Sequence, residues 1–314
     1  MKNWDDFHKK MYETTIGIEV EMNNITRQAA AKIVAKEIGA DGVYSAYHAR
    51  GTYDTWEVKD TYGDTWKLMR DSSIVGDQLQ KCELVTPILT YDDMDRVGKV
   101  LEALARAGAK SSPERGCGVH IHVGMTGHKA KTLRNLVNLV ACHEDLLEKA
   151  LNIEAGRLSR YCMKADARFL SELNTVKPET MTQLSEVWYS TQGGDDRRDW
   201  HYNRSRYHML NLHSVFTKGT VEFRFFQFEE ETGINADELR AYVQFCLALN
   251  QTAKEMATAG RKLKESAKRN PKYTMRTWLT RMGFIGEAYK TARAVFCRRL
   301  EGDSAYHGGR PHVA

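Results

Sequence analysis

Four short segments of this chain place ionisable side chains next to apolar ones: three hold a pair of acidic, basic or imidazole residues around an apolar residue, and in the fourth Glu83 stands alone among Cys82, Leu84 and Val85. They are Glu19-Val20-Glu21, Cys82-Glu83-Leu84-Val85, His120-Ile121-His122 and Glu222-Phe223-Arg224. Successive side chains of a β-strand point to opposite faces, so each segment predicts a strand with one apolar and one polar face. The apolar residues would pack on helices, and the polar residues would form a floor on the other face. This pattern restricts the chain to folds with a sheet that helices cover on one side.

The pattern of apolar residues along the rest of the chain predicts an α+β fold, in which an antiparallel sheet is backed by helices. Strands are expected over residues 14–22, within 42–70, and over 82–88, 118–123 and 220–228. Helices are expected over about 26–39, 91–107 and 129–151, in shorter pieces over 153–190, and over most of the chain after 228. No linker rich in proline and glycine divides the chain, so we expect one domain over residues 1–314, with a core at about 14–250 and a helical C-terminal extension at about 251–300.

Composition excludes some classes of protein. The chain has 314 residues and a net charge of +5, and it contains no apolar run of the ~20 residues that a membrane span needs. Its six cysteines form no Cys-x-x-Cys pair, which favours a reduced, cytoplasmic protein. A local basic run leaves nucleic-acid binding open without favouring it. The residues of that run are Arg261, Lys262, Lys264, Lys268, Arg269 and Lys272. No oligomeric state is predicted.

The polar floor itself predicts a divalent-metal site. A half-exposed sheet whose polar face merely meets water is the alternative for any single pair, but such a face usually carries Thr, Lys, Ser and Gln. Here the positions hold Glu, His and Arg, with no Lys. Carboxylates on adjacent strands would repel each other unless a cation neutralised them. Several carboxylates with one or two imidazoles suit Mg²⁺ or Mn²⁺ better than Zn²⁺.

Common nucleotide and hydrolase motifs are missing from the sequence. It has no Gly-x-x-x-x-Gly-Lys-[Ser/Thr] loop, no Gly-x-Gly-x-x-Gly after a strand and no Gly-x-Ser-x-Gly elbow. His143-Glu144 lacks the second histidine of a His-Glu-x-x-His zinc helix. The chain is therefore not an ordinary P-loop nucleotidase, and His143-Glu144 is expected to be a helix-surface pair.

The order of short motifs resembles the putative amidoligase family, within the carboxylate–amine ligase group of the glutamine synthetase and glutamate–cysteine ligase superfamily. The motifs are GIEVE at Gly17–Glu21, DSS at Asp71–Ser73, ELVTP at Glu83–Pro87, GVHIH at Gly118–His122, NLHS at Asn211–Ser214 and TVEFR at Thr220–Arg224. The resemblance spans residues from about 14 to 250. It implies a glutamine-synthetase-like curved antiparallel sheet as the active-site floor.

The resemblance also implies roles for individual residues. The metal ligands would be Glu19, Glu21, Glu83, His120, His122 and Glu222. Arg224 would stabilise the phosphoryl group that is transferred, and it forms the implied catalytic group together with Glu222 and His122. Arg224 would also contact ATP. Arg206 and Asn211 lead into the last strand, and from that position they are candidates to contact ATP or the acyl phosphate. The implied cofactors are ATP and Mg²⁺ or Mn²⁺.

Several assignments stay open at this stage. Either His120 or His122 is the imidazole ligand, and the number of metal ions is not fixed. Glu57 is a further candidate carboxylate or a surface strand residue. Asp71 belongs to an acceptor site or caps a turn. Asn211 contacts ATP or satisfies a backbone group in a loop.

Three functions therefore compete. The first is an ATP-dependent ligase that joins a small-molecule or peptide carboxylate to an amine through an acyl phosphate. The second is a metal-dependent hydrolase that uses the same floor and an activated water. The third is a polyanion-binding protein that uses the basic run, and the low net charge disfavours it.

Overall fold

The computed structural model describes residues 2–192, 197–260, 263 and 269–306. The chain divides into two compact units, which we describe separately. One unit comprises Met1–Met11, Gly124–Glu222 and Gln244–Ala314, and the other comprises Tyr12–Val123 and Phe223–Val243. We call them the helical unit and the sheet unit. The predicted α+β class is confirmed by the order of the elements.

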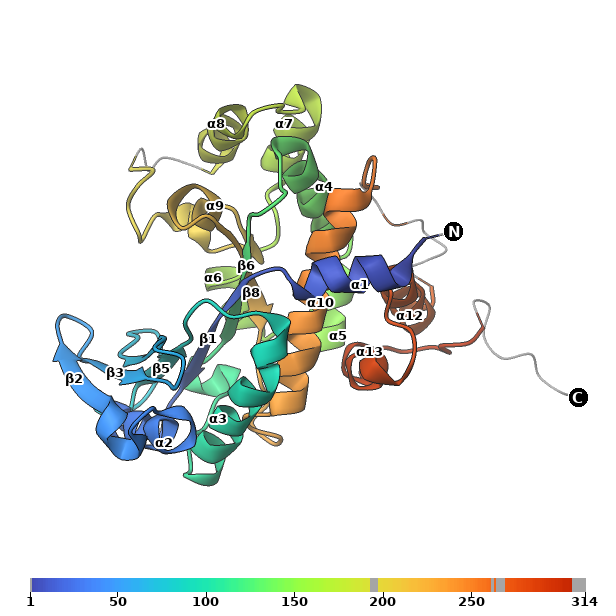
Figure 1. Ribbon diagram of the computed structural model, residues 1–314. Helices are drawn as coiled ribbons and strands as arrows, with labels where there is room; N and C mark the ends of the chain where they lie inside the picture. Colours follow the sequence, from blue (N-terminus) through green and yellow to red (C-terminus); the bar gives the residue numbers. More distant parts are fainter. Residues whose placement is uncertain (1, 193–196, 261–262, 264–268, 307–314) are drawn as a thin grey trace, which may run out of the picture. The chain divides into compact units, whose positions relative to one another are not determined.

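The sheet unit contains most of the strands (Figure 1). They are β1 (Ile16–Met22), β2 (Ala46–Arg50), β3 (Thr55–Lys59), β4 (Thr65–Met69), β5 (Cys82–Val85), β6 (Val119–Gly124) and the end of β8 (Thr220–Phe226). Their order in space is β2-β3-β4-β5-β1-β6-β8. Neighbouring strands from β2 through β6 pair antiparallel, as the sequence predicted. The central position of β1 puts its side chains between those of β5 and β6.

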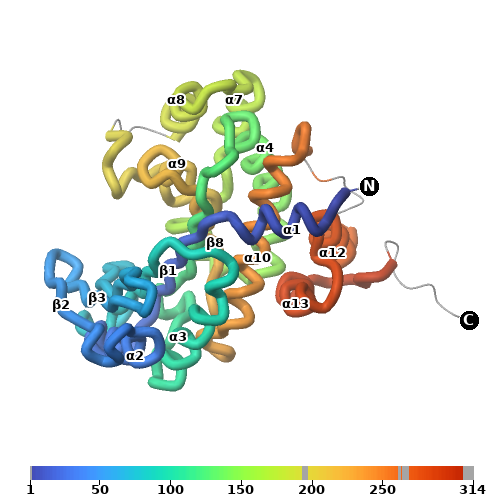
Figure 2. The backbone as a smooth tube through the Cα atoms, in the orientation of Figure 1, coloured from blue at the N-terminus to red at the C-terminus, as the bar shows by residue number. Residues whose placement is uncertain are grey.

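Helices cover the apolar side of this sheet. They are α2 (Arg27–Ile38) and α3 (Met94–Arg106), which lie side by side (Figure 2). Helix α2 contacts β2, β3 and β4. Ile18, Val20 and Leu84 are at most 1% exposed. Because the apolar residues of the strands are buried, the residues between them project from the other face.

Local sequence explains where these elements begin and end. The Thr26 hydroxyl accepts a hydrogen bond from the backbone N–H of Ala29 at 3.2 Å, as expected of a helix N-cap. Strand β5 ends at Val85, before the predicted 82–88, because the Thr86 hydroxyl accepts the backbone N–H of Ile18 at 2.9 Å. A side chain thus replaces the backbone acceptor at the end of the ladder.

The helical unit is built mainly from helices, together with a short strand and the beginning of β8. Its elements are α1 (Trp4–Tyr12), α4 (Ala130–Ala141), α5 (Glu144–Leu151), α6 (Ala155–Arg160), α7 (Ala167–Val176), α8 (Met181–Thr191), β7 (Leu210–Asn211), α9 (His213–Thr217), α12 (Pro271–Arg281) and α13 (Lys290–Cys297). Helices α7 and α8 pack against each other, and α13 packs against α5 and α12. Helix α10 (Ala236–Glu255) begins in the sheet unit and ends in the helical unit.

One predicted helix is interrupted. The sequence predicted a continuous helix over 129–151, but α4 ends at Ala141 and α5 begins at Glu144. The imidazole Nδ1 of His143 hydrogen-bonds to the Leu139 carbonyl at 2.8 Å, which is the acceptor that the His143 backbone N–H would use in an unbroken helix. That N–H instead donates to the Val140 carbonyl. The His143 ring also stacks on Trp278, with centroids 3.7 Å apart.

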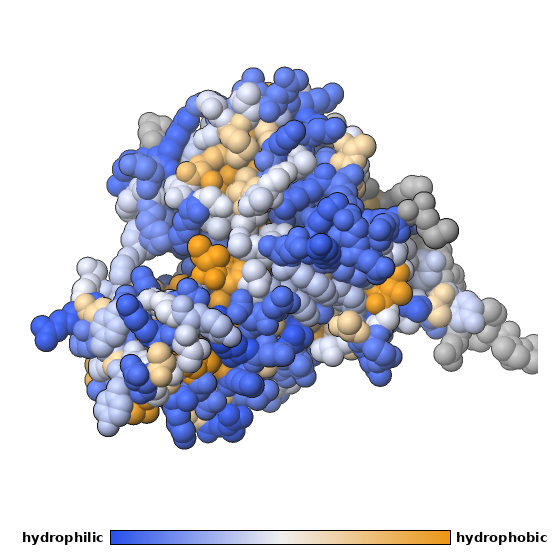
Figure 3. Space-filling model, in the orientation of Figure 1, coloured by the Kyte–Doolittle hydropathy of each residue, from blue (hydrophilic) through white to orange (hydrophobic). Residues whose placement is uncertain are grey.

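The surface shown in Figure 3 is mostly hydrophilic, and its apolar residues gather in small separate patches. Among the described residues, no helix is long and apolar enough to cross a membrane. Four residues of the predicted basic run, Arg261, Lys262, Lys264 and Lys268, lie outside the described residues. The structure therefore does not test the role of that run.

Candidate metal centre

The strand register brings the acidic and imidazole side chains of β1, β5 and β6 to one face. Glu19 lies opposite His120, and Gly17 lies opposite His122. Glu21 lies opposite Glu83 on the other side of β1. Residues that face each other across antiparallel strands project from the same side of the sheet. Five predicted ligands therefore share the polar face of the sheet unit: Glu19, Glu21, Glu83, His120 and His122.

Three of these side chains come close enough to hold one cation. Glu21, Glu83 and His120 each offer a ligand atom, and these atoms lie within 4.8 Å of one another. Two ligands of one Mg²⁺ or Mn²⁺ ion are separated by at most roughly twice the ~2.1 Å metal–oxygen distance, so modest adjustment suffices. The three residues are 6%, 9% and 5% exposed, respectively. We call Glu21, Glu83 and His120 the metal triad.

The chemistry of the metal triad fits a hard divalent cation. Glu21 and Glu83 are direct cross-strand partners, and like charges in such positions destabilise a sheet. Burial strengthens their repulsion because fewer water molecules screen it. One oxygen of Glu21 accepts the backbone N–H of Gly118 at 2.6 Å, which fixes the carboxylate at the beginning of β6. Two carboxylates and one imidazole form a donor set that suits Mg²⁺ or Mn²⁺.

Glu19 lies between the two histidines. One of its oxygens is 3.2 Å from Nδ1 of His120, and the other is 3.2 Å from Nε2 of His122. A carboxylate that bonds one ring nitrogen of a histidine fixes the orientation of the ring and thereby directs the other nitrogen. Glu19 can therefore align His120 within the metal triad. His120, rather than His122, is the histidine grouped with Glu21 and Glu83.

The other predicted residues lie on β8 and in the segment before it. Glu222, in the helical unit, is 2% exposed and accepts a 2.6 Å hydrogen bond from Nδ2 of Asn211. The Oδ1 atom of Asn211 accepts the backbone N–H of His213 at 2.8 Å, so its amide satisfies a backbone group, as one sequence interpretation expected. Arg224, in the sheet unit, is 4% exposed. Arg206 is half-buried and donates to the backbone carbonyl of His201.

Two carboxylates whose roles the sequence left undecided, those of Glu57 and Asp71, have partners in the structure. Glu57 accepts a hydrogen bond from the Tyr47 hydroxyl and lies 3.8 Å from the Lys67 ammonium. Its strand, β3, is three strands from β1, which corresponds to roughly 14 Å at ~4.8 Å per strand. Glu57 is thus a strand residue outside the metal triad. Asp71 caps a turn by accepting the backbone N–H of Ser73 at 2.6 Å.

Sequence reasoning did not single out Lys81 and Asn23, which extend the polar face at one end. Lys81 precedes Glu83 by two positions, and Asn23 follows Glu21 by two positions. Both are 8% exposed. The same alternation that identified Glu21 and Glu83 continues to these residues and could have identified them.

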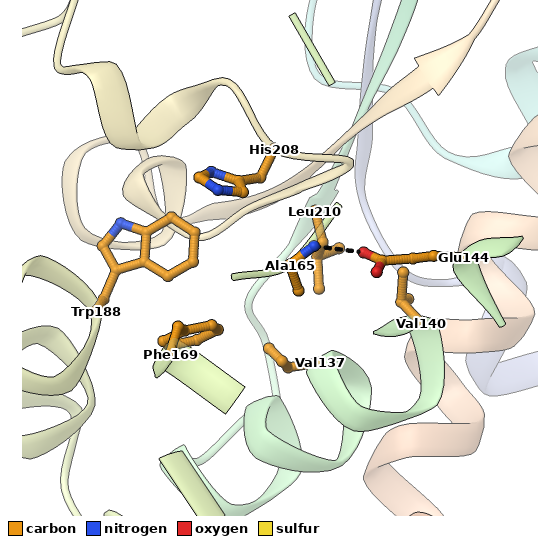
Figure 4. A pocket seen from close by; sticks show the side chains of 8 residues that line it. All are labelled: Val137, Val140, Glu144, Ala165, Phe169, Trp188, His208 and Leu210. Atoms are coloured by element: carbon orange, nitrogen blue, oxygen red, sulfur yellow. Dashed lines mark hydrogen bonds between the residues drawn. The ribbon is translucent and has the colours of Figure 1, made fainter. Parts of the chain in front are cut away.

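A separate small cavity lies in the helical unit (Figure 4). Its lining includes Phe169, Trp188 and His208, and the Glu144 carboxylate reaches into it and accepts the backbone N–H of Ala165 at 2.9 Å. Burial raises the pKa of Glu144 to about 7, although this hydrogen bond opposes the shift. Burial also lowers the pKa of His208. None of the predicted site residues lines this cavity.

The raised pKa predicts a pH-dependent effect of Glu144→Gln. In the folded protein the pKa of the Glu144 carboxyl is about 7, whereas the ordinary pKa of a glutamate in an unfolded chain is 4.5. The stabilisation from the protonated carboxyl is therefore complete below pH 4.5 and is lost as the pH rises through 7. At pH 8 the variant should be more stable by about 3 kcal/mol, and near pH 4.5 the two proteins should match. Urea unfolding at both pH values measures the difference. The exposed Glu172→Gln should show none, and an equal effect of Glu144→Gln at both pH values would contradict the assignment.

One of the comparisons with known proteins identifies a family. A family model described as "Putative amidoligase enzyme" matches residues 12–250. Among solved structures, the chain is similar to the crystal structure of a bifunctional glutathione synthetase from Pasteurella multocida, with 12% sequence identity and a TM-score of 0.43. The similarity covers 93% of this chain and 48% of that chain, so this chain spans about half the length of that protein. None of the curated proteins matches this chain in sequence.

Proposed function

The chain belongs to the putative amidoligase family, and we propose that it is an ATP-dependent enzyme that joins a carboxylate to an amine. The observation that supports this proposal most directly is the metal triad on the polar face of the sheet unit. A triad of two carboxylates and one imidazole suits the divalent cation that accompanies ATP in phosphoryl transfer. The residues of the metal triad lie within the matched segment 12–250, so the family match and the geometry support the same site.

The proposed reaction has two steps. An oxygen of the substrate carboxylate attacks the γ-phosphorus of ATP, the bond from that phosphorus to the bridging oxygen breaks, and ADP leaves. The amine nitrogen then attacks the acyl carbon, the carbon–oxygen bond to phosphate breaks, and the amine loses a proton. The products are an amide, ADP and phosphate. Activation is required because a free carboxylate has no adequate leaving group.

The residues of the floor have defined parts in this scheme. Glu21, Glu83 and His120 would hold a divalent cation, which when bound neutralises charge on the phosphate oxygens. Glu19 would orient His120 and His122 through its two oxygens, in addition to the ligand role implied by the resemblance. The strands hold these side chains on rigid backbone, which preserves the spacing that a metal site needs.

Further assignments rest on the resemblance. We propose that the antiparallel sheet is the floor of a glutamine-synthetase-like site. Arg224 is assigned to the transferring phosphoryl group, because a guanidinium offers forked donors to phosphate oxygens. Glu222 is proposed as a metal ligand and as a member of the catalytic group. Arg206 and Asn211 keep their proposed contacts with ATP.

A screen of carboxylate and amine pairs tests the proposed function. Purified protein is incubated with ATP and Mg²⁺, and mass spectrometry follows both the condensed product and ADP. We expect ADP and amide to form in equal amounts, and only when both organic substrates are present. Chelation of the divalent cation should abolish both. The Glu83→Gln variant should lose the reaction, and the Glu57→Gln variant on the same sheet should keep it.

The same assay separates the ligase from the hydrolase. A metal-dependent hydrolase would need no nucleotide and would release cleaved products in water. Thermal unfolding offers a faster test, because a ligand that binds only the folded state raises the melting temperature. Stabilisation by ATP with Mg²⁺ supports the ligase. Substrate cleavage that is unaffected by the removal of ATP would reject it.

A further inference from the structure

We propose that Lys81 binds the carboxylate of the substrate that is activated, beside the metal triad. This inference rests on the proposed ligase function and adds the recognition of one of its substrates. The evidence is the position of Lys81 on the polar face, the burial of its side chain and the absence of an ion pair within the part of the chain that the structure describes.

The backbone places Lys81 next to the metal triad. It immediately precedes β5, and Glu83 follows two residues later. In an extended chain, residues two apart project from the same face, at a spacing of about 7 Å. Cys82, between them, is 0% exposed and points into the apolar core. The Arg27 guanidinium fixes this backbone by donating to the Lys81 carbonyl at 2.6 Å.

The ammonium of Lys81 has little compensation for its burial. The residue is 8% exposed, and Nζ donates to the Ser72 backbone carbonyl at 3.3 Å. Among the described residues, no carboxylate lies within ion-pairing distance of Lys81, although Glu83 is two positions away. A buried charge without a counter-ion is costly, so a retained lysine of this kind points to an anionic ligand.

The neighbouring polar groups are already engaged with one another. Asn23 donates from Nδ2 to the Val75 carbonyl at 3.0 Å and accepts from Arg115 at 3.1 Å. Arg115 in turn forms an ion pair with Glu230. Lys81 is therefore the cation at this end of the floor whose charge is not matched by a carboxylate of the described chain.

The chemistry of the proposed reaction favours a carboxylate over a phosphate as the ligand. The cation held by the metal triad would neutralise phosphate oxygens. The substrate carboxylate must approach that negatively charged phosphate, and it needs a positive charge of its own to do so. The Lys81 ammonium supplies that charge, because Lys81 is two residues from Glu83 in an extended segment and projects from the same face. A lysine acts as a point charge and does not require the bidentate geometry of an arginine.

Thermal unfolding of four proteins tests this inference: the wild type, Lys81→Met, Lys81→Arg and the control Lys59→Met. Met keeps much of the volume and removes the charge, and Lys59 is an exposed lysine of the same sheet unit. Each protein is titrated with sodium acetate, with inorganic phosphate and with ATP plus Mg²⁺, and sodium chloride matches the ionic strength.

We expect acetate to raise the melting temperature of the wild type and Lys59→Met by ~2 °C or more near saturation, and to leave Lys81→Met unchanged. Lys81→Arg should retain part of the shift. Without ligand, Lys81→Met should melt at or above the wild-type temperature, because an uncompensated charge has been removed. A lysine that served only to hold the Ser72 carbonyl would instead give a less stable variant.

Three results would overturn the inference. One is an equal acetate shift in the wild type and Lys81→Met. Another is a Lys81-dependent shift with phosphate but none with acetate, which would assign the lysine to the nucleotide. If Lys81→Met does not fold, the third is an acetate shift of wild-type size in a folded Lys81→Gln variant, which also lacks the charge. Failure of ATP with Mg²⁺ to stabilise any of the proteins would reject the ligase function, and the acetate comparison would still decide the role of Lys81.

Discussion

The Glu21→Gln variant is expected to bind Mn²⁺ or Mg²⁺ about 100-fold more weakly than the wild type, or worse. Glutamine has the shape of glutamate, and its carbonyl oxygen can still accept the backbone N–H of Gly118. The substitution therefore removes one charge from the metal triad with little change in packing. Isothermal titration calorimetry of metal into each protein measures the difference.

Stability without metal should change in the opposite direction. Glu21 and Glu83 face each other across β1 and β5, and neutralising one of them relieves their repulsion. Metal-free Glu21→Gln should therefore melt at or above the wild-type temperature. Glu57→Gln is the matched control, since Glu57 lies on β3 with Tyr47 and Lys67 as partners. Equal metal affinity in the wild type and Glu21→Gln would remove Glu21 from the metal centre.

The Asp60→Ala variant is expected to lose about 3–5 kcal/mol of stability. Asp60 is 1% exposed, and its carboxylate accepts hydrogen bonds from the backbone N–H groups of Tyr62 and Asp64, the Trp66 indole and the Arg96 guanidinium. Alanine would leave all of these donors without their acceptor. The side chain of Arg96 is 15% exposed, and its guanidinium would keep its ion pair with Asp93 but lose the buried one with Asp60. Urea unfolding followed by circular dichroism measures the loss.

Asp64→Ala is the control for Asp60→Ala. Asp64 is an exposed residue of the same β3–β4 turn, and its backbone contacts persist in alanine. The control should change stability by less than ~0.5 kcal/mol, as surface substitutions usually do. If both variants lose the same small amount, the buried network around Asp60 contributes little to the stability of the hairpin.

The strands of the floor could be predicted from the sequence because their signal is local. In β1 and β6, apolar residues alternate with ionisable residues or glycine. The face of every side chain follows from that order. The register then needed only the pairing of neighbouring strands. The alternation sets the face of each side chain within its strand, and the strand pairing in the structure brings Glu19, Glu21, Glu83, His120 and His122 to one face.

What could not be predicted depends on contacts between residues far apart in the sequence. The break between α4 and α5 involves the stacking of His143 on Trp278, and hydrophobic periodicity carries no information on that contact. The selection of His120 for the metal triad depends on rotamers and on the position of Glu19 between two rings. Lys81 is buried and donates to the Ser72 carbonyl in the segment after β4, and periodicity carries no information on that contact.

Crystals of the protein grown with Mn²⁺ provide the most direct test of the metal centre. An anomalous difference map locates Mn²⁺ without assumptions about the surrounding residues. We predict a peak roughly 2.1–2.3 Å from oxygens of Glu21 and Glu83 and from a ring nitrogen of His120. A map at saturating Mn²⁺ with no peak between β1, β5 and β6 would contradict the account, and the polar face would then be a half-exposed sheet surface.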